Sequence, residues 1–566
     1  MKRQIAIGEQ DFEKIRKNHI FYVDKTDLIS EWWDGMDSVT LITRPRRFGK
    51  TLNMSMLNCF FSTKYAGRED LFDGLKIWER DDYRSIQGTY PVIFMSFAGV
   101  KDSSYDNCVK RLKSIIERAF RDHEYLAESN RLTDKDKCFF NHVSKEMDDN
   151  TATEALQNLS YLLEKHFGKK AVILLDEYDT PLQEAYVKGY WDELADFIRT
   201  LFNNTFKTNP YMERALMTGI TRVSKESIFS DLNNLRVITT TSESYAECFG
   251  FTEAEVFSAM EEQEIPEKEK SIVKEWYDGF TFGNKTDIYN PWSIISYLNE
   301  KKVGTYWANT SSNNLISHLL KTGHNNIKCG FEELLSGHCI ITTIDEQIIF
   351  NQLEHSINAI WSLLLASGYL KVVKREIFPE STKEDEYTLT ITNLETKRMF
   401  HSMITDWFKN TGVMNRFVKS MLEGNVLDMN RYMNEIALST FSSFDTGTKP
   451  GIKAPESFYH GFVLGLLVEN ASEYIVKSNR ESGFGRYDVV MQPKNTENPA
   501  VIMEFKVIAK DEGEKTLEDT AGNALKQIED KQYETELVSA GIPREKILRY
   551  GFAFEGKKCL IRMQNT

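Results

Sequence analysis

Lys50 and Thr51 are of the residue types that bind nucleotide phosphates, and they stand at the end of a turn that contains a glycine. The turn reads TRPRRFGKT (residues 43–51); it follows the apolar run 38–42 and precedes residues with the apolar spacing of a helix. A strand, a tight turn and a helix in this order aim backbone N–H groups at phosphate, with the lysine on the β- and γ-phosphates and the hydroxyl on Mg²⁺. Arg44 occupies the first glycine position of the general pattern G-x-x-x-x-G-K-S/T. An ordinary turn followed by a helix cap is therefore the alternative interpretation of this stretch alone.

A pair of carboxylates, Asp176 and Glu177, ends the apolar run 171–175. Such a run is typical of a buried parallel strand. At the carboxyl end of that strand we expect Asp176 to join the Mg²⁺ shell and Glu177 to polarise the attacking water. Because the pair follows the phosphate-binding turn in the right order, the two motifs together predict a site that binds ATP with Mg²⁺ and hydrolyses it.

A further apolar stretch, 214–220, ends in polar residues and predicts a third strand of the same sheet. In P-loop ATPases with a catalytic glutamate, the strand in this place carries a sensor of the γ-phosphate, and Thr218 is the candidate. Arg222 is predicted to stabilise transition-state charge, in cis or across the interface of a homo-oligomer formed through the ATPase domain. A strand-end hydroxyl and a surface arginine are the alternatives. Other residues of the turn are also expected to contact the nucleotide or a neighbouring subunit: Arg46, Arg47, Phe48 and Gly49.

A second group of chemically suited residues lies near the C-terminus, where Asp488 and the pair Glu504 and Lys506 stand on two predicted strands. Residues two apart on a strand share a face, so this pair can point at one metal-bound water. The two carboxylates would bind Mg²⁺, while the lysine would position the nucleophile or steady the phosphate. Gln527, on the helix that follows, is expected to line the same cleft. In a structure without metal, we expect the lysine to lean toward the carboxylates.

The spacing of these C-terminal residues fits the PD-(D/E)XK pattern of metal-dependent nucleases. Glu-x-Lys alone is usually a solvated strand face. Here an Asp, a hairpin, Glu-x-Lys and a helix with a glutamine follow one another in order. Charged groups on an otherwise apolar strand are costly unless they are paired or bound to metal, which favours the interpretation as a nuclease site.

The elements that position these residues predict an α/β protein of several domains, in keeping with its length of 566 residues. We expect a P-loop ATPase core with a parallel sheet, helices on both faces and an N-terminal helical collar in residues 1–240. Residues 241–304 predict a helical lid, and 305–446 a winged-helix-like spacer. We favour protein contact over DNA binding for that spacer, because its loop 379–386 carries mostly carboxylates, which repel phosphate. Residues 447–566 predict an α/β domain that resembles restriction endonucleases.

Composition and charge limit the classes of protein to which the chain can belong. The net charge of −14 argues against a generally basic coat for nucleic acid, although a local groove is still allowed. The seven cysteines contain no C-x-x-C pair, which disfavours a zinc ribbon or a disulfide framework and suits a reducing compartment. No apolar run has the length needed to span a bilayer, and the first residues lack a signal-peptide core. We therefore expect a cytoplasmic protein with no membrane partner.

Several motifs in a fixed order resemble the AAA-ATPase-like family, whose members often end in a PD-(D/E)XK nuclease domain and occur widely in anaerobic bacteria. An arginine at the first P-loop glycine belongs to that family's own pattern. The resemblance implies an ATPase coupled to a Mg²⁺-dependent nuclease, with nucleic acid, in the first instance DNA, as the partner. The alternative is a nucleotide-dependent switch whose C-terminal domain binds nucleic acid or protein without cleaving it. The motifs that carry the resemblance are residues 22–26, 44–51, 175–181, 218–222 and 289–293.

Overall fold

The computed structural model folds into two compact units. The first contains Met1–Leu319 and Cys339–Lys397, and the second contains Leu320–His338 and Arg398–Thr566. The helix expected over 457–474 and the linker expected at 447–451 lie outside the described residues. The structure describes residues 2–207, 209–222, 228–229, 231–307, 330–331, 333–335, 337–345, 356–378, 383–409, 414–440, 473–482, 485–508, 514–555 and 558–564.

A parallel sheet forms the centre of the first unit, as the apolar runs predict. Its order is β2-β3-β4-β1-β5, and every pairing in it is parallel. Because β4 lies between β1 and β3, the strand that carries Thr218 is a neighbour of both motif-bearing strands. The strands are β1 (Val39–Thr43), β2 (Val92–Ser96), β3 (Ala171–Asp176), β4 (Met212–Gly219) and β5 (Leu235–Ile238).

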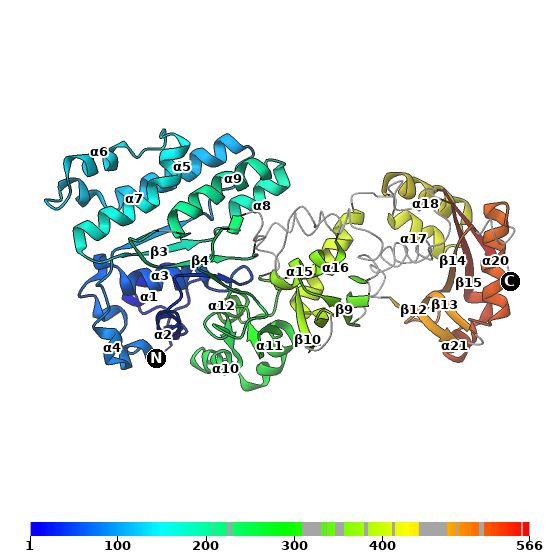
Figure 1. Cartoon of the computed structure of the whole chain (residues 1–566). Coiled ribbons are helices and arrows are strands. Elements are labelled where there is room, and N and C mark those ends of the chain that lie inside the picture. Colours follow the sequence, from blue (N-terminus) through cyan, green and yellow to red (C-terminus); the bar gives the residue numbers. More distant parts are fainter. Residues whose placement is uncertain are drawn as a thin grey trace. The chain divides into compact units, whose positions relative to one another are not determined.

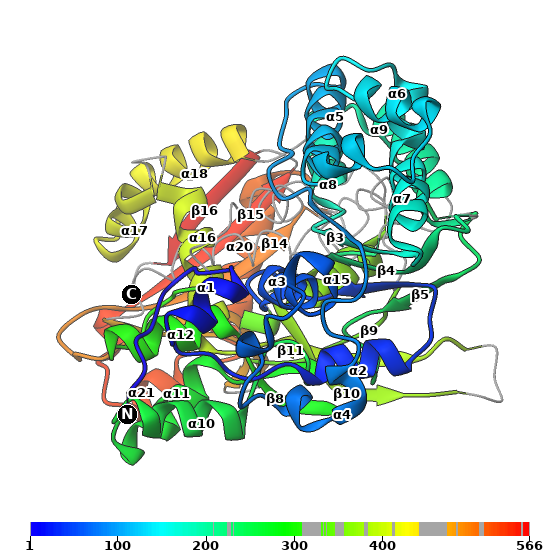
Figure 2. The same cartoon turned by 90° about the vertical axis from the view of Figure 1, so that its left-hand side faces the viewer.

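Helices cover both faces of this sheet, because successive side chains of each strand point to opposite faces. In β3, for example, Ile173 packs into one core and Leu174 into the other. The first core takes α5 (Tyr105–Arg121), α6 (Asp134–His142), α7 (Asp149–Phe167), α8 (Thr180–Lys188) and α9 (Trp191–Phe202) (Figures 1 and 2). The second core takes α1 (Phe12–Lys17), α2 (Asp27–Asp34), α3 (Lys50–Phe61) and α4 (Asp81–Arg84).

The lid is helical as expected, but it also contains a small antiparallel sheet that its composition did not predict. Thr252 and Glu255 form a reciprocal cap at the start of its first helix. The helices are α10 (Glu253–Glu262), α11 (Lys270–Tyr277) and α12 (Pro291–Glu300). The strands, in the order β6-β8-β7, are β6 (Phe251–Thr252), β7 (Phe280–Phe282) and β8 (Lys285–Tyr289). Strands of two to five residues are too short for a period of two to stand out in the sequence.

The middle region follows the expected order of helix, strand and strand. The helix α15 (Ile357–Ala366) ends before Gly368, whose positive φ of 84° turns the chain into the next strand. The strands β10 and β11 follow and form an antiparallel sheet with β9, which precedes the helix, in the order β10-β11-β9; α16 (Leu394–Lys409) comes next. Residues 379–382 of the acidic loop lie outside the described part of the chain. The strands are β9 (Ile340–Thr343), β10 (Leu370–Glu376) and β11 (Glu386–Ile391).

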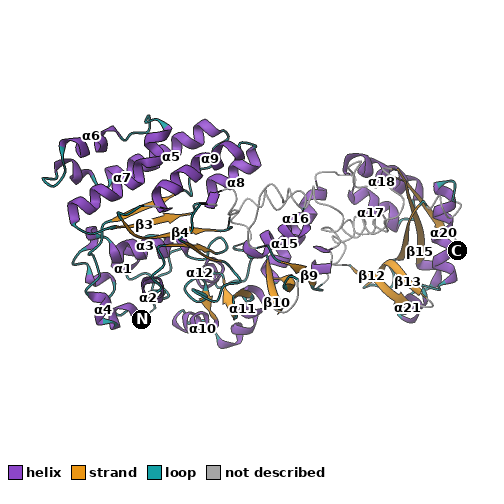
Figure 3. Ribbon diagram, in the orientation of Figure 1, coloured by secondary structure: helices purple, strands orange, loops and turns teal. Residues whose placement is uncertain are grey.

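The second unit is a mixed sheet of the order β12-β13-β14-β15-β16, with helices on both faces (Figure 3). The apolar residues on one face pack against α17 (Met414–Leu422) and α18 (Val426–Thr440), and those on the other pack against α20 (Leu517–Asp530) and α21 (Thr535–Ser539). The strands are β12 (Tyr474–Ser482), β13 (Gly485–Pro493), β14 (Ala500–Val507), β15 (Ile547–Glu555) and β16 (Lys558–Gln564).

The expected domain boundary at residue 447 is therefore too late. Phe417 and Met421 of α17 and Met429 of α18 belong to the same core as the strands of the second unit. The apolar periodicity of these helices shows that each covers a core, but periodicity does not reveal which core. Asn430 and Asn434 of α18 add hydrogen bonds to the backbone of β16 at Ile561 and Cys559.

Among the described residues, the structure contains no helix that is long and apolar enough to cross a membrane.

Candidate active sites

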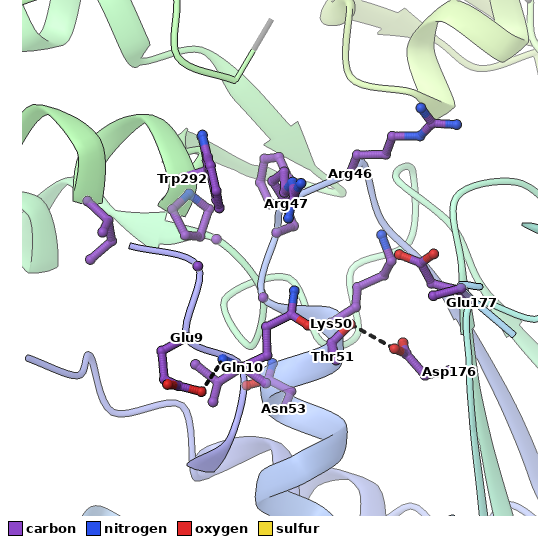
Figure 4. Close-up of a pocket in the computed structure, with 18 of the residues that line it drawn as sticks. Glu9, Gln10, Arg46, Arg47, Lys50, Thr51, Asn53, Asp176, Glu177 and Trp292 are labelled. Carbon is purple, nitrogen blue, oxygen red and sulfur yellow. Dashed lines mark hydrogen bonds between the residues drawn. The ribbon is translucent and has the colours of Figure 1, made fainter. Parts of the chain in front are cut away.

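A cavity of about 430 Å³ opens beside the phosphate-binding turn in the first unit (Figure 4). Its size lies within the range of small-ligand sites. The turn forms one wall, with Asp176 beside Thr51 and Glu177 beside Lys50. Further lining comes from the N-terminal segment, including Gly8, Ile20, Phe21, Tyr22 and Val23, from Pro291, Trp292 and Ile295 of the lid, and from residues that follow β2 and β3.

The turn ends where α3 begins at Lys50. Gly49 has a φ of 79°, a left-handed conformation that disfavours a side chain, and a Cβ there would meet no atom within 4 Å. Lys50 is 4% exposed, and its Nζ donates to the carbonyl oxygens of Arg44 (3.0 Å) and Pro45 (2.9 Å). Burial lowers the pKa of Lys50, and the negative charge of Glu177 opposes that decrease. The ammonium group therefore donates to two neutral carbonyl oxygens of the turn, with the carboxylates of Glu177, Asp176 and Asp179 and the guanidinium of Arg46 nearby.

Asp176 joins the phosphate-binding helix to the neighbouring strand. Its Oδ2 accepts a hydrogen bond from the hydroxyl of Thr51 (2.7 Å), and its Oδ1 accepts one from the hydroxyl of Thr218 (2.6 Å). Burial raises the pKa of Asp176, while the two hydroxyls act against that increase. A buried carboxylate beside a Thr hydroxyl offers the hard oxygen ligands that Mg²⁺ prefers.

Glu177 has a φ of 51°, which is uncommon for a residue with a side chain and costs backbone energy. Its backbone N–H lies 3.4 Å from the hydroxyl oxygen of Thr218, and its Oε2 accepts a hydrogen bond from the Thr180 hydroxyl (3.2 Å). Glu177 is partly exposed and lines the cavity. The strained turn therefore places a carboxylate at the cavity wall immediately after the buried Asp176.

In the second unit, the register of the strands brings the predicted carboxylates together. Val489 pairs with Met503 in the antiparallel ladder of β13 and β14, so the next pair places Asp488 opposite Glu504 on one face. Asp488 Oδ2 accepts a hydrogen bond from the backbone N–H of Phe505 (2.8 Å). Gln527 of α20 donates to Glu504 Oε1 and, at 3.2 Å, to the hydroxyl of Tyr533. The strand register and the Gln527 hydrogen bond therefore bring Asp488, Glu504 and Gln527 together, and their role as one metal-binding site stays a prediction.

Comparison with known proteins agrees with this geometry. Residues 6–229 match the family described as predicted AAA-ATPase, and residues 454–564 match the PD-(D/E)XK nuclease superfamily. The chain joins a predicted AAA-ATPase domain to a PD-(D/E)XK nuclease domain.

Two curated proteins illustrate the range of similarity. A protein of Azotobacter chroococcum mcd 1, named "Uncharacterized protein in vnfD 5'region", is 24% identical over 558 residues, which cover 96% of this chain and 95% of that protein. "Protein SEY1 homolog 2" of Entamoeba dispar (strain ATCC PRA-260 / SAW760) is 23% identical over 160 residues, or 28% of this chain and 19% of that protein. The first similarity extends over both domains.

Within the AAA-ATPase domain, the residues of the turn have different surroundings. Phe48 is 1% exposed, and its ring packs on Phe280 (4.8 Å between centroids), so its side chain secures the turn to the lid. Arg47 has a φ of 64° and stacks on Trp292 (4.3 Å), at the edge of the cavity. Arg46 lines the cavity and donates to Gln183 (3.4 Å). The two arginines, and not the phenylalanine ring, are therefore available to a phosphate.

Two predicted nucleotide contacts lie elsewhere. Thr218 is fully buried and bonds to Asp176, so it lies behind the cavity wall. Arg222 does not belong to the described cavity lining; it borders a separate cleft of about 20 Å³ with Thr241 and Asp345. The geometry therefore does not support the expected role for Arg222 in cis.

Arg44 fills the first glycine position of the P-loop with a buried cation. Its guanidinium donates to the carbonyl oxygens of Thr43 (2.9 Å) and Thr239 (2.7 Å) and lies 4.5 Å from the ring centre of Phe282. Burial lowers its pKa to about 10, so the group stays charged at neutral pH. Arg44 therefore ties the turn to the segment after β5 and to the lid.

Asp179 is a residue of the AAA-ATPase domain whose importance the sequence did not reveal. It is fully buried, and its Oδ2 accepts hydrogen bonds from the backbone N–H groups of Ile220 and Thr221 (both 2.9 Å) and from Gln183 (2.8 Å). Burial raises its pKa. Since Gln183 also contacts Arg46, Asp179 links the segment after β4 to the phosphate-binding turn. The sequence feature that could have pointed to Asp179 is the order D-E-Y-D at residues 176–179, which places a third carboxylate just after Asp176 and Glu177.

Within the nuclease domain, Lys506 lies on the same strand face as Glu504. Among the described residues it forms no ion pair with Glu504 or Asp488, and its role beside them stays a prediction. Gln527 approaches Glu504 instead, because α20 packs directly on β14. Tyr533 also approaches the two carboxylates: burial raises its pKa, and their negative charges add to that increase. Tyr533 therefore lies beside the predicted nuclease residues.

Proposed function

We propose that this protein binds ATP with Mg²⁺ in the cavity of its AAA-ATPase domain and hydrolyses it. The observation that supports this proposal most strongly is the pair of hydrogen bonds that Asp176 accepts, one from Thr51 and one from Thr218 behind the cavity wall, with Glu177 next to it. Thr51 and Asp176 would hold Mg²⁺, which would neutralise charge on the phosphates. Lys50 would exchange its carbonyl partners for phosphate oxygens, and Glu177 would accept the proton of the attacking water.

We propose that the nuclease domain cleaves nucleic acid, with DNA as the first substrate to test. Asp488 of β13 and Glu504 of β14 share one face of the sheet and would hold a divalent metal that supplies an activated water. Lys506, at the end of the same strand, would contact the phosphate at which cleavage takes place. Gln527 would orient Glu504. We also propose Mg²⁺ as the metal and a bacterial origin. We propose a cytoplasmic location as well, and the free thiols of all six described cysteines support that location.

The experiment that tests both activities uses the full chain with Mg²⁺. Phosphate release from ATP is measured alongside cleavage of single- and double-stranded DNA and RNA. ATP hydrolysis with cleavage of at least one substrate supports the proposal. ATP hydrolysis with binding but no cleavage favours the alternative, a nucleotide-dependent switch whose nuclease-like domain only binds nucleic acid.

A further inference from the structure

The backbone of the phosphate-binding turn is held by residues that lie far outside the matched AAA-ATPase region. The carbonyl oxygen of Arg46 accepts hydrogen bonds from the indole Nε1 of Trp307 (3.0 Å) and the side-chain amide of Asn290 (3.3 Å). Trp307 is 2% exposed, so its N–H would be costly to leave unbonded. The position of Arg46 therefore depends on the lid and on the segment that follows the lid.

Trp307 is in turn fixed by a buried carboxylate, Glu395, in the first turn of α16. The backbone N–H of Trp307 donates to Glu395 Oε1 (2.7 Å), and the hydroxyl of Ser293 in α12 donates to Oε2 (2.7 Å). Glu395 is 1% exposed. One carboxylate thus joins the lid helix to the tryptophan that reaches the turn.

Aromatic packing fixes the indole ring as well. Its ring centre lies 5.2 Å from that of Tyr369 and 5.7 Å from that of Phe280, which also contacts Phe48 of the turn. Beside these rings, a Cβ at Gly368 would lie 2.9 Å from Pro45, so the middle region approaches the turn too closely for a side chain. The part of the turn before Lys50 is therefore enclosed by the lid and the middle region.

We propose that Trp307 and Glu395 are positioning residues of the ATPase site. They hold the backbone of Arg46, so that the Arg46 side chain and the neighbouring Lys50 meet the phosphates in the geometry that hydrolysis needs. Because Lys50 donates to the carbonyls of Arg44 and Pro45, a phosphate that attracts Lys50 also changes the turn next to Arg46. That change passes through Trp307 to the first turn of α16. The inference rests on the proposed ATPase activity.

The test uses the full chain with Trp307→Phe, which keeps an aromatic ring but removes the indole N–H. Trp276→Phe is the matched control, since Trp276 is also buried in the lid but packs in a core away from the turn. We expect kcat for ATP hydrolysis to fall about tenfold in Trp307→Phe, with KM changed less than about twofold, and both to stay near wild type in the control. Glu395→Ala should lower kcat similarly, and Glu395→Gln, which keeps an acceptor for Trp307, should lower it less. Equal kcat in Trp307→Phe and Trp276→Phe would overturn the inference.

A second measurement separates this inference from the proposed function. Tryptophan fluorescence is recorded while a non-hydrolysable ATP analogue is added, and analogue binding is measured by calorimetry. We expect a fluorescence change in the wild type and in Trp276→Phe that falls at least about twofold in Trp307→Phe, although the analogue still binds. Binding with no hydrolysis in the wild type would defeat the proposed ATPase activity, and the fluorescence comparison would still decide whether Trp307 responds to the nucleotide. An equal fluorescence change in all three proteins would contradict that response.

Discussion

The two candidate active sites are assembled in different ways. In the nuclease domain, Asp488 and Glu504 come from adjacent strands only 16 positions apart in the sequence, and strand register alone places them together. In the AAA-ATPase domain, the cavity draws on residues from the N-terminal segment to the lid, and its turn is held by Trp307. Local strand pairing therefore specifies the first site, whereas tertiary packing specifies the second. Substitutions should accordingly act locally in the nuclease domain and spread widely in the AAA-ATPase domain.

The largest effect is expected for Glu504→Ala. Loss of a metal-binding carboxylate removes several kcal/mol of charge stabilisation, so DNA cleavage should fall about a thousandfold while ATP hydrolysis stays near wild type. Cleavage and phosphate release are measured on the same preparation. Glu497→Ala, which removes an exposed carboxylate of the same domain, is the control. Parallel loss of both activities in Glu504→Ala would show that the two sites are not independent.

Lys50→Ala should weaken ATP binding and lower hydrolysis about a hundredfold, because it removes the charge that faces the phosphates. Glu177→Gln should keep binding while slowing hydrolysis by a similar factor. Calorimetry of ATP binding and steady-state phosphate release distinguish the two variants. Lys17→Ala, at an exposed ion pair on α1, is the control. Unchanged turnover in both Lys50→Ala and Glu177→Gln would mean that ATP is hydrolysed elsewhere.

Asp179→Asn tests whether the hydrogen bonds behind the cavity affect the rate of ATP hydrolysis. The asparagine keeps one oxygen acceptor but loses the charge that receives hydrogen bonds from Ile220, Thr221 and Gln183. We expect kcat for ATP hydrolysis to fall about tenfold with little change in cleavage of DNA. The exposed Asp122, changed to Asn, serves as the control. An ATPase rate equal to that control would limit Asp179 to a structural role.

The smallest expected effect is a change in stability with pH, caused by the carboxylate pair Asp278 and Asp287 in the lid. Burial, a hydrogen bond and the charge of Asp287 raise the pKa of Asp278 to about 6. Between about pH 4 and pH 6, Asp278 keeps its proton in the folded protein, whereas the unfolded chain has released it. The protonated Asp278 therefore stabilises the fold fully below about pH 4, and this stabilisation is lost as the pH rises through about 6. Asp278→Asn should therefore be more stable than wild type by about 1 kcal/mol at pH 7.5, a value reduced for partial exposure, and equal to it near pH 4.

Denaturant unfolding at several pH values checks this expectation. In the lid, the carboxylates of Glu253, Asp278 and Asp287 form a cluster, and the ammonium group of Lys274 pairs with Glu253 and Asp287. The positive charge of Lys274 therefore already balances part of the negative charge of this cluster. Added Mg²⁺ should raise the melting temperature through Asp488 and Glu504, and the shift should persist in Asp278→Asn. If Asp278→Asn instead abolishes the Mg²⁺ shift, the lid and not the nuclease domain binds the metal.

The site residues that could be predicted from the sequence are those whose positions follow from strands and their pairing. Asp176 and Glu177 end one strongly apolar strand, and Lys50 and Thr51 follow another after a short turn, so chain order and parallel pairing leave little freedom. Asp488 and Glu504 follow from the period of two within a hairpin.

The contacts that could not be predicted from the sequence depend on packing between segments that are far apart in the chain. The contact of Trp307 with Arg46 spans 261 positions, and that of Trp307 with Glu395 spans 88. No local pattern encodes such pairs. The cleft that Arg222 borders and the residue that bonds to Glu504 are equally matters of tertiary structure.

The asparagines of α18 have a consequence for the surface of the nuclease domain. Asn430 and Asn434 each both donate to and accept from the backbone of the outermost strand β16, at Ile561 and Cys559. Four helical residues rise about 6 Å, close to the roughly 6.7 Å between alternate residues of a strand, so two amide side chains one helical turn apart can act in place of a sixth strand. The amide groups that would recruit a foreign strand at these positions are already bonded. This edge of the sheet is therefore closed at these positions to pairing with another polypeptide and to edge-to-edge aggregation.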